Sequence, residues 1–247
     1  MDRVKTYVEG FDEALDGGIP RGSVVLVAGT PGTMKTALTF SILYENVRAG
    51  SRALYISLEE SQEDLRASMA DLGMAGLEDI ELYILDIGRI RLEHKDEELA
   101  KNWLDVLQKY IEQRVRVNQF DLIAIDSLEA LYSLSRIENP RRELFHFFGF
   151  LRSLSATSFL ISEIPSGSHG AYGRYDEEFL ADGILHLKHA PIGDTEVQLR
   201  IRCVKMRRSR HEHGDFALVR SGEKFQITPG IFWSSRFMAA ISLILSW

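Results

Sequence analysis

The stretch GTPGTMKT, at residues 29–36, decides the fold that this sequence predicts. It matches the phosphate-binding pattern G-x-x-x-x-G-K-[ST] at Gly29, Lys35 and Thr36, whereas Met34 stands where the pattern has its second glycine. In such a loop backbone N–H groups surround phosphate oxygens at a helix N-terminus, the lysine reaches the outer phosphates, and the next hydroxyl binds Mg²⁺. The stretch therefore raises the question of whether a loop with methionine still binds a nucleotide.

The flanking sequence gives this loop its expected context. Residues 24–28 form a continuous apolar run rich in β-branched side chains, which is typical of a buried parallel strand. Residues 35–48 have the pattern of a helix, and Gly50 is placed to end it. The sequence thus predicts a strand, a loop and a helix, with a nucleotide bound by Gly29, Thr30, Pro31, Gly32, Thr33, Met34, Lys35 and Thr36.

The rest of the chain first alternates strands with helices and then has strands alone. Strands are expected at residues 53–58, 82–85, 122–125 and 158–161, and helices at 62–73, 96–117 and 141–154. After Gly183 the expected strands are 184–187, 197–204, 216–219 and 225–227. This pattern predicts an α/β fold with a mainly parallel central sheet flanked by helices, and with antiparallel strands at its C-terminal end.

Two segments stand apart from this pattern. Residues 165–178 are rich in glycine and poor in apolar side chains, so we expect a mobile loop at the carboxyl end of the fifth strand. Residues 231–247 form an apolar tail to which the sequence assigns no role. We expect one domain over residues 1–230.

Composition excludes several classes of protein. The formal net charge of −7 disfavours a nucleic-acid partner, which usually requires a basic surface. Cys203 is the single cysteine, so no intrachain disulfide can form, and this fits a reducing cytoplasm. The first residues lack the apolar core of a signal peptide, and no stretch of about 20 apolar residues supports a spanning helix.

Acidic residues after two later strands complete the expected site. Asp126 ends an apolar strand, where an acid is expected beside Mg²⁺, so Thr36 and Asp126 are the predicted metal ligands. Glu59 and Glu60 would emerge at the same edge of the sheet, where a carboxylate can orient or deprotonate the attacking water. Either could instead simply open the next helix, where acids are favoured. Given the loop, we favour a functional role for at least one of them.

Four stretches resemble the KaiC-like branch of the RecA-type ATPases, a branch that includes archaeal RadA-paralogue-like proteins. They are GFDEALDGGIPRGSVVLVAGTPGTMKT, YISLEESQEDLRASMADLG, FDLIAIDS and KMRRSRHEHGDF, and they follow one another in the family's order. The resemblance implies a RecA-like phosphate-loop fold with ATP and Mg²⁺ as ligands. It also implies that Glu59 or Glu60 supplies the catalytic carboxylate and that Asp126 lies on the metal side.

The same resemblance implies an oligomer. The family's K-x-R pattern, which reaches the nucleotide of a neighbouring subunit, maps to Lys205 and Arg207. A bland alternative is that the basic run at residues 200–210 is a solvated strand face. Two residues depart from the family's pattern: Met34 replaces one glycine, and Arg208 replaces the glycine that usually follows the K-x-R arginine.

Glycine at position 34 could be needed for either of two reasons. A positive φ would cost methionine about 1 kcal/mol or more, or a phosphate oxygen could pass close to Cα. If residue 34 is right-handed helical, neither obstacle is severe, because methionine is a good helix former with a flexible side chain. Since Lys35, Thr36, Asp126 and both glutamates are retained, we interpret Met34 as a tolerated variant whose cost is in affinity or turnover.

The resulting hypothesis is a regulatory or signalling ATPase that hydrolyses ATP slowly as a homo-oligomeric ring or filament, with an unknown protein partner. One alternative is a recombination or repair accessory protein that uses ATP to hold DNA. Another is a scaffold that binds nucleotide without hydrolysis. Membrane binding is not supported, because Arg236 is the only cation at the start of the apolar tail.

Overall fold

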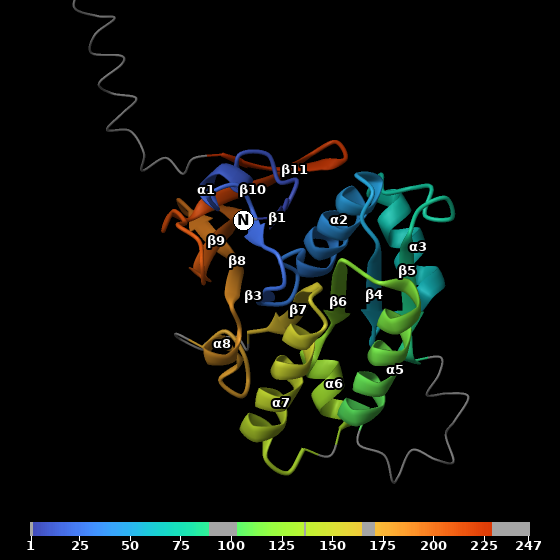
Figure 1. Ribbon diagram of the computed structural model, residues 1–247. Coiled ribbons are helices and arrows are strands. Elements are labelled where there is room, and N and C mark those ends of the chain that lie inside the picture. The colour runs from blue at the N-terminus through green and yellow to red at the C-terminus, as the bar shows by residue number, and fades with distance from the viewer. Residues whose placement is uncertain (1, 89–102, 136, 165–170, 229–247) are drawn as a thin grey trace, which may run out of the picture.

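The computed structural model describes residues 2–88, 103–135, 137–164 and 171–228 (Figure 1). Its strands are β1 (Arg3–Val4), β2 (Ile19–Pro20), β3 (Val24–Gly29), β4 (Ala53–Ser57), β5 (Leu82–Asp86), β6 (Leu122–Asp126), β7 (Thr157–Glu163), β8 (Gly183–Ile192), β9 (Glu196–Met206), β10 (Phe216–Ser221) and β11 (Lys224–Thr228). Its helices are α1 (Phe11–Ala14), α2 (Lys35–Arg48), α3 (Gln62–Asp71), α5 (Trp103–Asn118), α6 (Leu128–Leu134), α7 (Pro140–Ser153) and α8 (Glu177–Leu180).

Nine strands form one mixed sheet in the order β11-β10-β9-β8-β3-β7-β6-β4-β5. The strands from β8 to β5 in this order are parallel to one another, and all six residues of β3 are buried, as expected for a parallel strand covered on both faces. The register places Gly29 beside Glu163 and Ser57 beside Asp126. The carboxyl ends of β3, β4, β6 and β7 therefore meet at one edge of the sheet, where polar side chains gather.

Helices cover both faces of this parallel part (Figure 1). One core joins the sheet to α2 and α3, and the other joins it to α5, α6 and α7. On α7 the fully buried residues Leu144, Phe147, Phe148 and Leu151 recur at helical spacing and form one apolar face. The predicted α/β architecture is confirmed.

The C-terminal strands are antiparallel, as predicted. β8 and β9 form a long hairpin with an irregularity at Ile184 and Leu185, and β10 and β11 extend the sheet beyond it. Because β8 is parallel to β3 and β9 returns antiparallel to β8, the end of β9 lies at the amino end of β3. This reversal separates the basic end of β9 from the edge that carries the phosphate loop.

Several elements were not predicted, and one expectation needs correction. The pair β1–β2 and the short helices α1, α6 and α8 are too brief to give a periodic pattern. The segment expected to be mobile at residues 165–178 is anchored at its described end, since Glu177 is fully buried and accepts hydrogen bonds from Tyr132 and from the Tyr175 N–H. The buried Glu177 side chain fixes this end of the segment, although the polar composition of the segment had suggested a mobile loop.

Two expectations concern residues that lie partly or wholly outside the described ranges. The helix expected from residue 96 is seen from Trp103, and its expected start lies outside the described residues. The tail at residues 231–247 also lies outside them, so the domain boundary at residue 230 stays a prediction. None of the helices within the described ranges is long and apolar enough to cross a bilayer.

Candidate functional site

The 29–36 stretch connects β3 to α2 at the carboxyl edge of the sheet. A Cβ on Gly29 would lie 2.5 Å from the carbonyl oxygen of Leu187, so close packing against β8 explains this glycine. Gly32 has a φ of 79°, which glycine adopts without strain. Thr33 is fully buried and donates a 2.7 Å hydrogen bond to the Thr30 carbonyl, which closes the turn.

Lys35 begins α2 and directs its ammonium group back over the loop. Its side chain is only 7% exposed, and Nζ donates to the Thr30 carbonyl at 3.1 Å and lies 3.9 Å from Oε1 of Glu163. Burial lowers the pKa of Lys35, although the charges of Glu163 and Asp126 oppose this change. A buried ammonium with one hydrogen bond among the described residues can still bind an anion, as the phosphate-loop hypothesis requires.

Met34 adopts the left-handed conformation, with φ 61° and ψ 28°. The right-handed alternative is therefore wrong, and the backbone itself accounts for glycine at this position. An L-residue with a Cβ pays about 1–2 kcal/mol for this conformation. The side chain packs against the core on the α2 side of the sheet, which offsets part of that cost. The loop thus keeps its shape with methionine, and the strain lies at the residue before Lys35.

Asp126 ends β6 beside the first turn of α2. Its Oδ2 accepts a 2.8 Å hydrogen bond from the Thr36 hydroxyl and a 2.6 Å hydrogen bond from the Tyr55 hydroxyl. Burial raises the pKa of Asp126, and these two hydrogen bonds counteract the rise. The structure therefore brings together the two predicted metal ligands. Tyr55 gave no signal in the sequence, because a tyrosine in a strand is ordinarily a core residue.

Glu59 and Glu60 follow β4 at the same edge. Ser127, the residue after Asp126, donates a 2.6 Å hydrogen bond to Oε1 of Glu59. The backbone of Glu60 is held by the Ser57 hydroxyl. Burial, followed by the charges of Asp126 and Glu59, raises the pKa of Glu60. Both glutamates thus lie at the edge of the sheet that carries Thr36 and Asp126.

Two further acids belong to this edge and were not predicted. Glu163 ends β7 next to Lys35, and Glu129 in α6 accepts a 3.2 Å hydrogen bond from Ser162. Burial raises the pKa of Glu129 to about 7, and its Oε2 has no hydrogen-bond partner among the described residues. The rule that selected Asp126, an acid at the end of a strand, also selects Glu163. The burial of Glu129 has no comparable signal in the sequence.

A cavity of about 380 Å³ opens at this edge of the sheet, beside the phosphate loop and the carboxyl ends of β4, β6 and β7. Of the predicted binding residues, those lining it are Pro31, Gly32, Thr33, Met34, Lys35, Thr36, Glu59, Glu60 and Asp126. Gly29 and Thr30 lie outside the lining, and Thr30 contributes through its bond to Lys35. A loop N-terminal to a helix and a buried ammonium fit a phosphate group.

The donor set also fits magnesium. Within the described ranges no cluster of three or more His, Cys, Asp or Glu residues is arranged to hold a metal by itself. Magnesium bound with a nucleotide requires no such cluster, because phosphate oxygens and water supply most of its ligands. A hydroxyl from Thr36 and a carboxylate from Asp126 are the hard oxygen ligands that it prefers.

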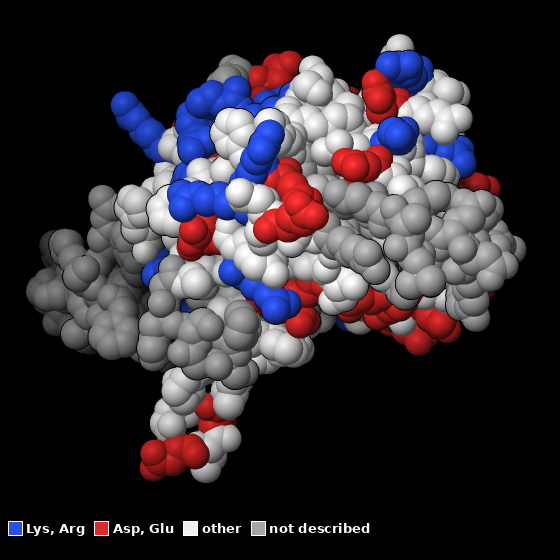
Figure 2. Space-filling view, turned by 90° about the horizontal axis from the view of Figure 1, so that it is seen from below, with Lys and Arg blue, Asp and Glu red and all other residues white. Residues whose placement is uncertain are grey.

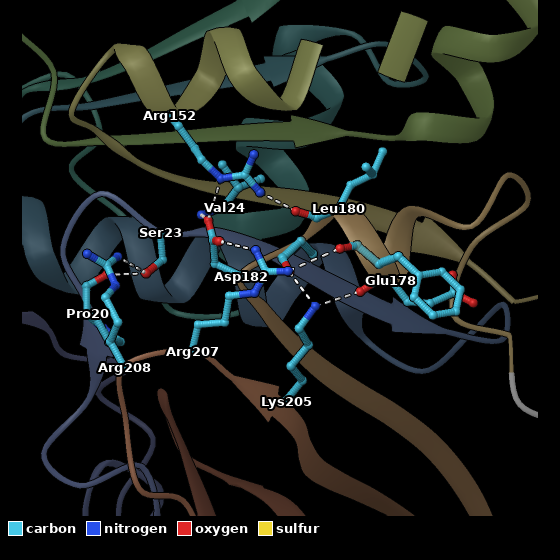
Figure 3. Close-up of polar contacts among 12 residues, drawn as sticks. Pro20, Ser23, Val24, Arg152, Glu178, Leu180, Asp182, Lys205, Arg207 and Arg208 are labelled. Carbon is cyan, nitrogen blue, oxygen red and sulfur yellow. Dashed lines mark hydrogen bonds and ion pairs between the residues drawn. The ribbon is translucent and has the colours of Figure 1, made fainter. Parts of the chain in front are cut away.

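Lys205 and Arg207 lie near the amino end of β3, whereas the phosphate loop follows its carboxyl end (Figure 3). Lys205 Nζ donates to the carbonyls of Glu178 and Ala181 at 2.9 and 2.7 Å. Arg207 forms a 3.0 Å ion pair with Asp182 and donates to the Phe179 carbonyl at 3.3 Å. Both side chains point to the segment at residues 178–182, as their i, i+2 spacing predicted. Both are remote from the phosphate loop of their own chain.

Arg152 of α7 joins this cluster from the opposite side (Figure 3). It pairs with Asp182 at 3.0 Å and donates to the Leu180 carbonyl. Burial would raise the pKa of Asp182, but hydrogen bonds from the Val24 N–H and Arg152 outweigh it, and the pKa is lowered. Burial and the nearby charge of Arg207 lower the pKa of Lys205. Arg152 and Arg207 share the one carboxylate of Asp182, and Lys205 binds backbone carbonyls beside them. The two arginines are thus only partly neutralised by their partner.

Comparisons with known proteins agree with this geometry. Residues 4–229 match the family model "ATPase: KaiC". The chain is 28% identical to circadian clock oscillator protein KaiC 1 of Synechocystis over 93% of its length, and it spans only 44% of that relative. It is 29% identical to a UPF0273 protein of Aeropyrum pernix, with 85% of this chain and 87% of that protein covered.

A solved structure has the same architecture. The crystal structure of a KaiC-like protein from Pyrococcus horikoshii matches with a TM-score of 0.76 at 27% identity. The match covers 92% of this chain and 99% of that one.

Proposed function

This chain belongs to the KaiC ATPase family, and from that premise we propose that it binds ATP with Mg²⁺ at the 29–36 loop and hydrolyses the γ-phosphate. The observation that carries the proposal is the shared cavity at the carboxyl ends of the strands, where Lys35, Thr36, Asp126 and both glutamates meet. Lys35 binds the outer phosphates, and Thr36 with Asp126 holds the cation. The bound Mg²⁺ would neutralise charge on the phosphate oxygens.

The carboxylates give the site its expected chemistry. In a phosphoryl transfer to water, the protein positions the nucleophile and stabilises charge. Glu59 is oriented by Ser127, and Glu60 lies beside it. One of them accepts a proton from, or orients, the attacking water. Slow turnover is part of the proposal, because the strained backbone at Met34 lies directly before Lys35.

Assembly completes the proposal. β3 has six residues, so its two ends lie about 16 Å apart. Lys205 and Arg207 cluster at one end and the phosphate loop is at the other. We therefore propose that these cations act on the nucleotide of another copy in a ring or filament. A regulatory role in the cytoplasm is supported by the names of the clock relatives and by the single, buried Cys203.

The DNA-binding alternative receives less support. Figure 2 shows that basic and acidic side chains are interspersed on the described part of one face. The net charge of −7 would also weaken attraction to a polyanion. A salt-dependent affinity for DNA would favour this alternative. Bound ATP without phosphate release would favour the scaffold alternative.

The test is to titrate a fluorescent ATP analogue in the presence of Mg²⁺ and to measure phosphate release in parallel. Lys35→Ala should weaken binding by about 10- to 100-fold, because a charge-assisted contact to phosphate is lost. Lys224→Ala removes a cation from β11, at the far end of the sheet, and should bind as the wild type does. Equal affinity in Lys35→Ala and wild type would exclude the loop as the binding site.

A further inference from the structure

Tyr55 connects the core of the molecule to the candidate site. Its side chain is fully buried, and its ring packs against Phe40 of α2 with centroids 5.2 Å apart. Its hydroxyl donates a 2.6 Å hydrogen bond to Oδ2 of Asp126. A buried phenol needs a partner for its hydroxyl. Here the partner is the carboxylate that the proposed function places beside the metal.

The sheet register explains how Tyr55 reaches this carboxylate. Tyr55 on β4 is the direct neighbour of Ala124 on β6. Asp126 lies two residues beyond Ala124, so its side chain is on the same face of the sheet. The methyl group of Ala124 is small and leaves room for the tyrosine ring to extend along that face. The contact is thus built from two buried strands, which hold it more rigidly than a loop would.

The two oxygens of Asp126 have different surroundings. Oδ2 accepts both hydrogen bonds, from Tyr55 and from Thr36. No described residue donates to Oδ1, although Asp126 lines the cavity. Two donors on one oxygen restrict rotation of the carboxylate. By donating its hydrogen to Asp126, the Thr36 hydroxyl also keeps its oxygen lone pairs for another ligand.

We propose that Tyr55 is a positioning residue for the divalent cation that accompanies the nucleotide. It holds Asp126 so that Oδ1 and the Thr36 oxygen are both available to that cation, and it touches neither metal nor nucleotide itself. This inference rests on the proposed function of the site. It predicts that the hydroxyl of Tyr55 affects metal affinity more than nucleotide affinity, since the phosphates are bound by the loop and Lys35.

Tyr55→Phe removes only the hydroxyl, and Tyr44→Phe provides a matched control. Tyr44 belongs to the same core, is also buried, and donates a 2.8 Å hydrogen bond to the Ala75 carbonyl instead of to an acid. Mn²⁺ affinity is measured from its electron paramagnetic resonance signal with a non-hydrolysable ATP analogue present. Affinity for the analogue alone is measured in a chelating buffer, and thermal unfolding reports on the fold.

Tyr55→Phe should weaken Mn²⁺ binding by about tenfold, as is usual for a partner that orients a metal ligand. Its affinity for the metal-free analogue should stay within about twofold of wild type, and Tyr44→Phe should change neither affinity. Equal Mn²⁺ affinity in wild type and Tyr55→Phe overturns the role of Tyr55 and leaves the proposed function intact. A matching loss of metal-free affinity also overturns it, because that indicates a general distortion. Absence of nucleotide-dependent Mn²⁺ binding by the wild type overturns the proposed function, and this inference with it.

Discussion

Arg207 forms a 3.0 Å ion pair with Asp182, and the N–H of Val24 at the start of β3 donates to the same carboxylate. In the free chain the guanidinium is thus held at the end of β3 opposite the phosphate loop. Asp182 also pairs with Arg152, so its single charge is divided between two arginines. A phosphate group from another molecule would meet an incompletely neutralised cluster.

Mixing two inactive variants should restore part of the activity. Lys35→Ala lacks a cation in the loop and Arg207→Ala lacks the basic residue at the other end of β3, so each alone should release little phosphate. In a mixture some interfaces join an intact loop to an intact arginine. Phosphate release is measured against protein concentration, and wild-type specific activity should rise with it. Arg210→Ala, an exposed residue of the same basic run, is the control and should behave as wild type. A wild-type protein that hydrolyses ATP normally as a monomer at every concentration contradicts the prediction.

The two glutamates should differ in their effect on turnover. Glu59 is oriented by Ser127 beside Asp126, and a general base must first be positioned. Glu59→Gln should therefore lower the turnover number by about 100-fold or more while ATP binding survives. Glu60→Gln should have the smaller effect. Single-turnover phosphate release with measured ATP affinity separates the two. If the double Gln variant hydrolyses ATP at the wild-type rate, neither residue is the base.

Met34→Gly should raise affinity for Mg-ATP by a few-fold. Glycine adopts the observed φ of 61° without strain, and the missing Cβ lets the backbone approach a phosphate. Stability should change by less than about 1 kcal/mol, because relief of strain is offset by the flexibility of glycine in the unfolded chain. Gln119→Gly, at another left-handed residue, with φ 49° and remote from the cavity, is the control. Similar gains in affinity from both substitutions would contradict a local effect at the loop.

Stability should decrease as the pH rises through neutrality, in part because of Glu129. Its folded pKa of about 7 exceeds the ordinary value of 4.5, so its contribution is fully present below pH 4.5 and is lost as the pH rises through about 7. The difference corresponds to about 3 kcal/mol of unfolding free energy. Glu129→Gln cannot ionise and should show a flatter profile in urea unfolding between pH 5 and 8. Parallel profiles for wild type and Glu129→Gln would falsify this assignment.

The sequence predicted the central fold well because its signals there are local and strong. The apolar run before Gly29 and the acid after residues 122–125 mark strand ends, and parallel strands bring such ends to one edge. Tyr55 and Glu129 could not be found in this way. Their importance comes from burial and from contacts between strands or helices distant in sequence, which periodicity does not encode.

The two departures from the family's glycine pattern share one backbone conformation. Met34 and Arg208 are the two residues that replace glycines of the family's pattern, and both have a φ of 61°. The sequence marked both positions as departures, but only the backbone shows their common physical cause. Both residues carry a side chain that strains the backbone there, yet both positions keep the left-handed conformation that glycine adopts freely.

The reversal of the chain between β8 and β9 has a consequence for symmetry. It puts the loop and the Lys205–Arg207 cluster on two different surfaces, at opposite ends of one strand. When the loop of one copy meets the cluster of the next in head-to-tail order, the contact is heterologous, because it joins two different surfaces. Copies joined in this way all point in the same direction. They either close into a ring by rotation or continue as a helical filament, whereas a two-fold dimer would form the contact twice, once in each direction.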